Sequence, residues 1–176
     1  MLARARRACY DEKNDKGGIH MRRSDRAVTD AAKIREIILR CECCRLGLCD
    51  GEECYIVPLS FGYEESGGVR RFYFHSAKEG RKLELIEKTH RAGFELDCGY
   101  CLHESETACK NSAAFQSVIG TGRIAAVTDP AEAREGLRSI LRHTTGKADW
   151  TLPEGAEQSV RVLRLDVETL ACKEHG

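Results

Sequence analysis

The chain has 176 residues, a length that fits one globular domain, and 41% of them are hydrophobic, which is enough for a core. Its 28 lysines and arginines equal its 28 aspartates and glutamates, and this zero net charge argues against a general nucleic-acid binder, which needs a cationic surface to neutralise phosphates. No apolar run approaches the length of a membrane span, so the sequence predicts no membrane partner.

The N-terminal segment differs from the rest of the chain. It is basic, lacks the apolar stretch of a secretion signal, and shows no sustained period, so we expect a disordered leader over residues 1–20. A coherent pattern begins at Met21 and predicts one domain over residues 21–176. Without a visible signal, the ten cysteines are interpreted mainly as reduced thiols of a cytoplasmic protein and not as a disulfide framework.

The first predicted element is an amphipathic helix over residues 29–41. Thr29 or Asp30 can cap its N-terminus. Its apolar residues recur at the spacing of one helix face, which predicts that they face the core: Ile34, Ile37, Ile38 and Cys41.

A hairpin is predicted next, over residues 44–63. Asp50–Gly51 is a strong tight-turn signal between two β-rich runs. Pro58 has no backbone donor, so it marks a bulge, an edge or a strand end.

The remaining elements follow a glycine-containing turn at residues 66–68. In the strand over 69–75, alternation places Phe72 and Phe74 on one face and Tyr73 and His75 on the other. The later strands are predicted over 92–98, 115–127 and 159–170, and the later helices over 78–89 and 129–143. Asp129 can cap the last helix, a linker follows it, and its predicted inner face consists of Ala133, Leu137, Ile140 and Leu141. About six strands, about three helices and short connections predict a mainly β fold, an antiparallel β-barrel with flanking helices.

The junction between the strand at 69–75 and the following helix has the composition of an anion site. Ser76 and Glu79 have the spacing of a capping box, so we expect the helix to begin directly after the strand. A helix start is electropositive, and Arg81 and Lys82 would repel it unless an anion lay there. A bound phosphate resolves this conflict, and the alternative is an ordinary solvated helix face.

Four blocks in order resemble the 5-nitroimidazole-resistance (Nim) family of pyridoxamine 5′-phosphate oxidase-like flavoproteins. They are MRRSDRAVTD from Met21, YIVPLSFGYE from Tyr55, FYFHSAKEGRKLELI from Phe72 and SVIGTGRI from Ser117. The resemblance extends over residues 21–173 and implies a six-stranded antiparallel FMN-binding split barrel. It also implies a homodimer with FMN in clefts between the two subunits.

The resemblance implies the cofactor-binding residues as well. Val57, Pro58, Leu59 and Ser60 would line the isoalloxazine ring; Phe74, His75 and Ser76 would lie along the ribityl and phosphate side; Arg81 and Lys82 would hold the phosphate; and Ser117 would also contact the flavin. His75 is the candidate catalytic residue, because an imidazole ordinarily titrates near neutrality and can deliver a proton. The alternative is a structural histidine that bonds a backbone group or the phosphate.

The implied function is that of an FMN-dependent reductase of the Nim type, which passes electrons to a small electron-poor heteroaromatic substrate such as a nitroimidazole. Two alternatives remain open, a pyridoxamine 5′-phosphate oxidase-like oxidase and a non-catalytic flavin-binding protein. A third reading is a zinc site, since the spacing of Cys98 and Cys101 on a turn suits zinc, with His103 and Cys109 as further ligands. We expect no metal, because the second half of such a site is incomplete.

Overall fold

The computed structural model describes residues 23–176. Residues 1–22, which include the predicted leader and Met21, lie outside the described part. The described strands are β1 (Ala27–Val28), β2 (Cys44–Asp50), β3 (Glu53–Leu59), β4 (Gly62–Ser66), β5 (Val69–Ser76), β6 (Arg91–His103), β7 (Ser112–Ala126) and β8 (Arg161–His175). The helices are α1 (Ala31–Arg40), α2 (Arg81–Thr89), α3 (Pro130–Thr145) and α4 (Ala156–Ser159), with single 3₁₀ turns at Ser24–Arg26 and Ala108–Lys110.

The strands form one antiparallel sheet that stays open. Its order is β3-β2-β6-β7-β8-β5-β4, and β1 pairs with β8. The predicted six-stranded antiparallel barrel differs from the structure in two respects: the described residues contain eight strands, and the sheet does not close, because β3 and β4 are edges of the ladder. The predicted hairpin merged β3 with β4, but β3 ends at Leu59 and β4 begins at Gly62 to pair with β5 instead.

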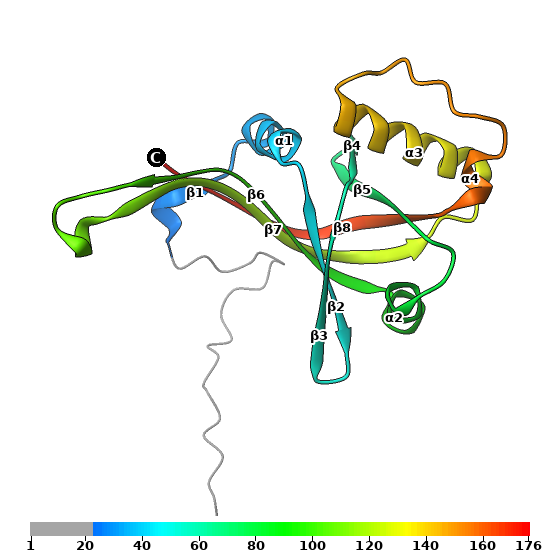
Figure 1. Ribbon diagram of the computed structural model, residues 1–176, viewed down its shortest axis with the longest axis horizontal. Coiled ribbons are helices and arrows are strands. Elements are labelled where there is room, and N and C mark those ends of the chain that lie inside the picture. The colour runs from blue at the N-terminus through cyan, green and yellow to red at the C-terminus, as the bar shows by residue number, and fades with distance from the viewer. Residues whose placement is uncertain (1–22) are drawn as a thin grey trace, which may run out of the picture.

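The open sheet still curls around one core. The rings of Phe72 on β5 and Phe94 on β6 lie 5.0 Å apart between centroids, although β7 and β8 separate these strands in the sheet. Phe72 also packs against Phe61 and Phe74, and all three are fully buried. Aromatic side chains from strands that are not neighbours in the sheet therefore meet in one core. Figure 1 shows the course of the strands.

The predicted faces of α1 and α3 are largely confirmed. Asp30 caps α1 by accepting a hydrogen bond from Lys33 N at 2.8 Å, and the predicted apolar face is buried. Asp129 caps α3, which packs with Tyr73 and Val162 on the face of β5 opposite the main core. Within residues 23–176, no helix is both long and apolar enough to cross a membrane.

Helix α2 begins later than predicted. We expected it to start at residue 78 behind a Ser76–Glu79 capping box, but Ser76 still pairs with Arg161 in the β5–β8 ladder. The N-cap is Gly80, whose φ of 128° favours glycine, and no side chain caps the helix. The capping-box prediction was wrong because Ser76 is the last residue of β5 and lies four residues before the N-cap of α2.

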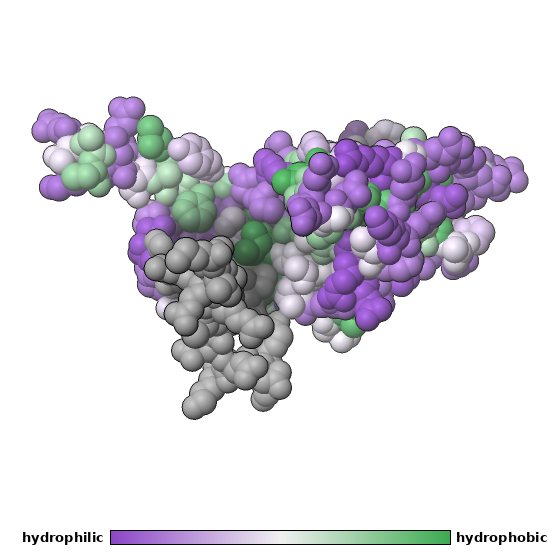
Figure 2. All heavy atoms as spheres, turned by 90° about the horizontal axis from the view of Figure 1, so that it is seen from below, coloured by the Kyte–Doolittle hydropathy of each residue, from purple (hydrophilic) through white to green (hydrophobic). Residues whose placement is uncertain are grey.

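The long ladder of β6 and β7 projects as an arm (Figure 1). Its register shifts between Cys98 and Cys101, with Gly99 at a φ of 66°, so these cysteines lie at a bulge within β6 and not on the predicted turn. Tyr100 and Leu102 are exposed on the arm. Figure 2 shows this arm with hydrophobic residues among hydrophilic ones, while charged and polar side chains dominate the rest of the visible face.

Gly62 tests the close contact between β4 and α3. A Cβ there would lie 2.6 Å from Ile140 N and from Ser139 C, so Gly62→Ala must displace α3 and should lower the free energy of unfolding by about 1–3 kcal/mol. Gly47→Ala is the matched strand control, because its Cβ would meet nothing closer than Gly93 O at 3.7 Å and should change that energy by less than about 0.5 kcal/mol. Urea unfolding of both variants measures the difference, and equal losses would contradict the packing described.

Candidate functional site

The end of β5 presents its side chains to two different sides of the sheet. Phe74 and Ser76 face the core side and are buried, whereas His75 lies on the opposite face with Tyr73 and is exposed. Because the Phe74 side chain is fully buried, only its backbone is available to a ligand. The predicted Phe74, His75 and Ser76 are therefore contiguous in sequence, but their side chains do not point into one site.

The start of α2 is an electropositive backbone site. The first bonds of the helix run from Leu83 N and Glu84 N to Gly80 O, at 2.9 and 3.3 Å. The N–H groups that precede them have no acceptor within the helix, as at any helix start, and they favour an anion.

Arg81 at this helix start already has anionic partners. Its guanidinium donates to Asp50 Oδ2 at 2.9 Å and to Glu53 Oε2 at 3.3 Å, and it lies 5.2 Å from the Tyr55 ring centroid. The hydrogen bond to Asp50 is the main reason that the pKa of Arg81 lies above its ordinary value. The carboxylates of Asp50 and Glu53 thus offset the repulsion between Arg81 and the electropositive start of α2.

Lys82 differs from Arg81. Its side chain is half-buried, and burial lowers the pKa of its ammonium group below the ordinary value. Across residues 23–176 no hydrogen-bond or ion-pair partner of Lys82 is present. A partly desolvated ammonium in the first turn of a helix, with no partner among residues 23–176, fits the phosphate end of a flavin.

The predicted ring-binding residues lie on an edge strand. Val57 and Leu59 pack against the core, whereas Pro58 and Ser60 are exposed. Among the described strands β3 pairs only with β2, so one row of its backbone N–H and C=O groups has no strand partner. Glu53, which contacts Arg81, lies on the same strand as Val57. Val57 is four residues further along β3, a distance of about 13 Å.

Ser117 is not brought to the same place. It is half-buried on β7, opposite Asp97 and Lys173, and β2 and β6 separate β7 from β3. The C-terminal end of β7, at Ala126, is the end that approaches His75. Ser117 lies nine residues before Ala126, which is about 30 Å along the strand. Within one chain, Ser117 therefore stands apart from the other predicted site residues.

His75 lines a cavity that was not predicted from the sequence. The cavity has a volume of about 230 Å³ and, besides His75, almost only apolar walls: Leu137, Ile140, Leu141, Leu152, Ala156, Ser159 and Val160. The apolar positions of α3 were visible in the sequence, but they were interpreted only as its inner face. A small apolar cavity with one imidazole suits a compact ring compound.

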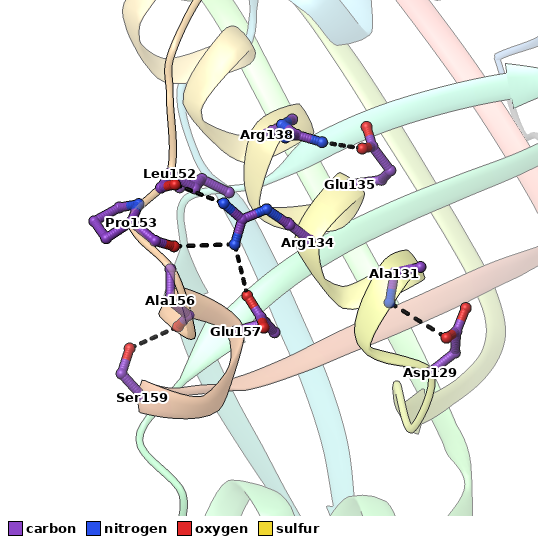
Figure 3. Close-up of polar contacts among 10 residues, drawn as sticks. All are labelled: Asp129, Ala131, Arg134, Glu135, Arg138, Leu152, Pro153, Ala156, Glu157 and Ser159. Atoms are coloured by element: carbon purple, nitrogen blue, oxygen red, sulfur yellow. Dashed lines mark hydrogen bonds and ion pairs between the residues drawn. The ribbon is translucent and has the colours of Figure 1, made fainter.

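Arg134 holds the outer wall of this cavity in place. Its guanidinium donates to Leu152 O at 2.5 Å, to Pro153 O at 3.0 Å and to Glu157 Oε2 at 3.0 Å. Figure 3 shows Arg134 reaching from α3 to the segment before α4 and to α4 itself. The segment that the sequence indicated only as a linker is thus fixed to α3 above the cavity.

The alternative zinc site gains no support. Within the described residues, no group of three or more His, Cys, Asp or Glu side chains is arranged to hold a metal ion. Cys98 is half-buried, with its thiol 3.5 Å from Gln116 Oε1, while Cys101, His103 and Cys109 are exposed on the arm. The nine cysteines of residues 23–176 are all free thiols, and Cys41 and Cys44 are buried as expected.

Comparison with known proteins places these features in context. A family model described as pyridoxamine 5′-phosphate oxidase matches residues 30–174. No curated protein matches the sequence. A structure from Bacteroides thetaiotaomicron, described as a candidate 5-nitroimidazole antibiotic resistance protein, is 28% identical with a TM-score of 0.71, over 84% of this chain and 86% of that one.

Two more distant structures share the fold. The flavocytochrome Anf3 from Azotobacter vinelandii is 19% identical with a TM-score of 0.73, over 89% of this chain and 72% of that one. An FAD and heme binding protein from Mycobacterium smegmatis is 12% identical with a TM-score of 0.71, over 86% of this chain and 74% of that one.

The role of Arg134 is testable against a neighbour on the same helix. Arg134→Ala removes three contacts to the segment over the cavity, so it should lower the free energy of unfolding by about 1–3 kcal/mol and speed tryptic cleavage at Lys147. Arg138→Ala removes only an exposed pair with Glu135 and should cost less than about 0.5 kcal/mol. Urea unfolding and limited proteolysis measure both; if the two variants behave alike, Arg134 does not hold the segment.

Proposed function

The chain belongs to the pyridoxamine 5′-phosphate oxidase family, and from that premise we propose that it binds FMN and reduces a small electron-poor heteroaromatic compound, as a reductase of the Nim type. The family match confirms the split-barrel fold class, mainly antiparallel β with flanking helices. The Nim assignment draws support from the Bacteroides thetaiotaomicron structure and from the resemblance in sequence. The observation that carries the proposal is the half-buried Lys82 at the start of α2, which has no hydrogen-bond or ion-pair partner among residues 23–176.

The phosphate of FMN is proposed to lie at the start of α2. Lys82 supplies a point charge there, and the free helix N–H groups supply directed donors. Arg81 is within reach, but a phosphate must share its guanidinium with Asp50 and Glu53 or displace them. Lys82 is therefore the principal anchor in this proposal and Arg81 the secondary one.

The ring is proposed to lie along Val57–Ser60, where the free edge of β3 offers backbone donors and acceptors. The position of Ser117 supports the expectation of a homodimer, because within one chain this residue is far from the α2 start. In a homodimer with the cofactor between subunits, Ser117 reaches a flavin bound mainly by the other subunit.

The cavity beside His75 is proposed to hold the acceptor of a flavin bound mainly by the other subunit of the homodimer, because the α2 start of the same chain lies on the opposite face of β5. Bound flavin supplies the electron chemistry, which no side chain of the protein can supply. His75 supplies a proton to the reduced acceptor from a ring nitrogen, and the apolar walls on α3 and α4 provide contacts for the acceptor ring. A volume of about 230 Å³ suits a single small ring.

Lys82→Met separates cofactor binding from stability. Loss of a charge-assisted contact should weaken FMN binding by about 10- to 100-fold. The same change should stabilise the flavin-free protein at neutral pH, because a lowered lysine pKa means that burial opposes the charged form in the fold. This gain should shrink as pH rises through the folded pKa of Lys82, where the wild-type ammonium loses its proton.

Fluorescence titration with FMN and urea unfolding at two pH values measure both effects. Lys110→Met is the matched control, since Lys110 is exposed on the arm and should change neither FMN affinity nor stability. Unchanged FMN affinity in Lys82→Met would remove the proposed phosphate anchor.

His75→Gln tests the proton-donating role. The variant should keep FMN, because its side chain lies on the face of β5 opposite Ser76 and the α2 start, but it should react about 10²- to 10⁴-fold more slowly. The measurement is anaerobic stopped-flow reoxidation of the reduced, FMN-loaded protein by a 5-nitroimidazole; a second experiment mixes the oxidised, FMN-loaded protein with pyridoxamine 5′-phosphate without oxygen. Equal reoxidation rates in the variant and the wild type contradict the assignment, and reduction of the flavin by pyridoxamine 5′-phosphate favours the oxidase alternative.

A further inference from the structure

The tip of the β2–β3 hairpin carries two cysteines directly opposite each other. Cys49 pairs with Cys54 in the register of the two strands, and both are exposed free thiols. The chain between them contains only the pair Asp50 and Glu53 and the turn Gly51–Glu52, where Gly51 has a φ of 64°. No other pair of exposed cysteines in the described strands is matched in this way.

The position of this pair in the hairpin suits a disulfide. In a hairpin that turns on two residues, the pair flanking the turn is hydrogen-bonded, and the next pair outward is of the non-hydrogen-bonded type. Opposite residues of that type have Cα atoms about 4.5 Å apart and side chains on the same face, and disulfides accept Cα separations of about 4.4–6.8 Å. Cys49 and Cys54 occupy that next pair outward, so they can be joined without moving the strands apart.

The same tip holds the cation at the start of α2. Asp50 follows Cys49 and Glu53 precedes Cys54, and these two carboxylates bind Arg81 at 2.9 and 3.3 Å. A covalent link between the cysteines fixes the twist of the tip and therefore the placement of both carboxylates. The thiol pair is therefore next to the two carboxylates that hold Arg81, the secondary anchor in the proposed phosphate site.

We propose that Cys49 and Cys54 form a reversible disulfide by exchange with a small-molecule disulfide, and that this link strengthens the hold of Asp50 and Glu53 on Arg81 at the expense of FMN. In the first step the thiolate of one cysteine attacks a sulfur of the small disulfide and releases one small thiol. In the second step the other cysteine attacks the mixed disulfide and releases the second thiol. The two cysteines are oxidised, the small disulfide is reduced, and the two cysteine protons end on the released thiols.

A tryptic digest tests the disulfide without any reference to flavin. The peptide between Arg45 and Arg70 contains Cys49 and Cys54 and no other cysteine, so an internal link makes it two hydrogens lighter and blocks its alkylation. The full chain is equilibrated with oxidised glutathione, alkylated and digested without reductant. The peptide over residues 92–110, which carries Cys98, Cys101 and Cys109, is the internal control and should stay alkylated. Equal oxidation of both peptides, or alkylation of Cys49 and Cys54, overturns the assignment.

The effect on the cofactor is measured separately and rests on the proposed function. Oxidised protein should bind FMN about fivefold or more weakly than reduced protein, and Cys49→Ser should bind FMN equally in both conditions. If the disulfide forms but FMN affinity does not change, the coupling to Arg81 is wrong. If neither form binds FMN, the proposed function fails while the digest still decides the disulfide.

Discussion

The alternation of side chains along β5 is the constraint on which the rest of the structure depends. Phe72 and Phe74 fill the core on one face, and Tyr73 and His75 meet α3 on the other. Because β5 also pairs with β4 and β8, this alternation fixes where the core and α3 lie at the same time. It places the imidazole in an apolar cavity on one side of the sheet and leads the chain into the start of α2 on the other. The proposed proton donor and the proposed anion site thus share one strand but lie on opposite faces of it.

The two cations at the start of α2 have different electrostatic roles. Arg81 is neutralised by carboxylates of the β2–β3 turn, so its charge stabilises the packing of that turn against the helix whether or not a ligand is bound. Lys82 is partly desolvated and has no such partner in the described residues 23–176, so burial disfavours its charged form in the fold. A bound anion would offset this unfavourable desolvation of the Lys82 ammonium, and residues that lower stability in this way are common at functional sites.

The sequence predicted the elements whose signals are local. The apolar spacing of Ile34, Ile37 and Ile38, the Asp129 cap and the alternation around Phe72 correspond to the observed helices and strand. It misplaced the start of α2, because the ladder between Ser76 and Arg161 joins positions far apart in the chain and overrides a local capping signal. The cavity beside His75 was not predictable for the same reason, since its walls come from β5, α3 and the segment around α4. The carboxylate partners of Arg81 likewise come from a turn distant in sequence.

The proposed recognition of the FMN phosphate by the start of α2 is tested by comparing FMN with riboflavin, which differs from FMN only in lacking that phosphate. The dissociation constants of both flavins are measured for the flavin-free protein at low and high salt. FMN should bind at least about tenfold more tightly, and added salt should narrow the difference in affinity, because the phosphate makes a charge-assisted contact to a partly exposed ammonium. Equal affinities for the two flavins at low salt would contradict the proposed recognition.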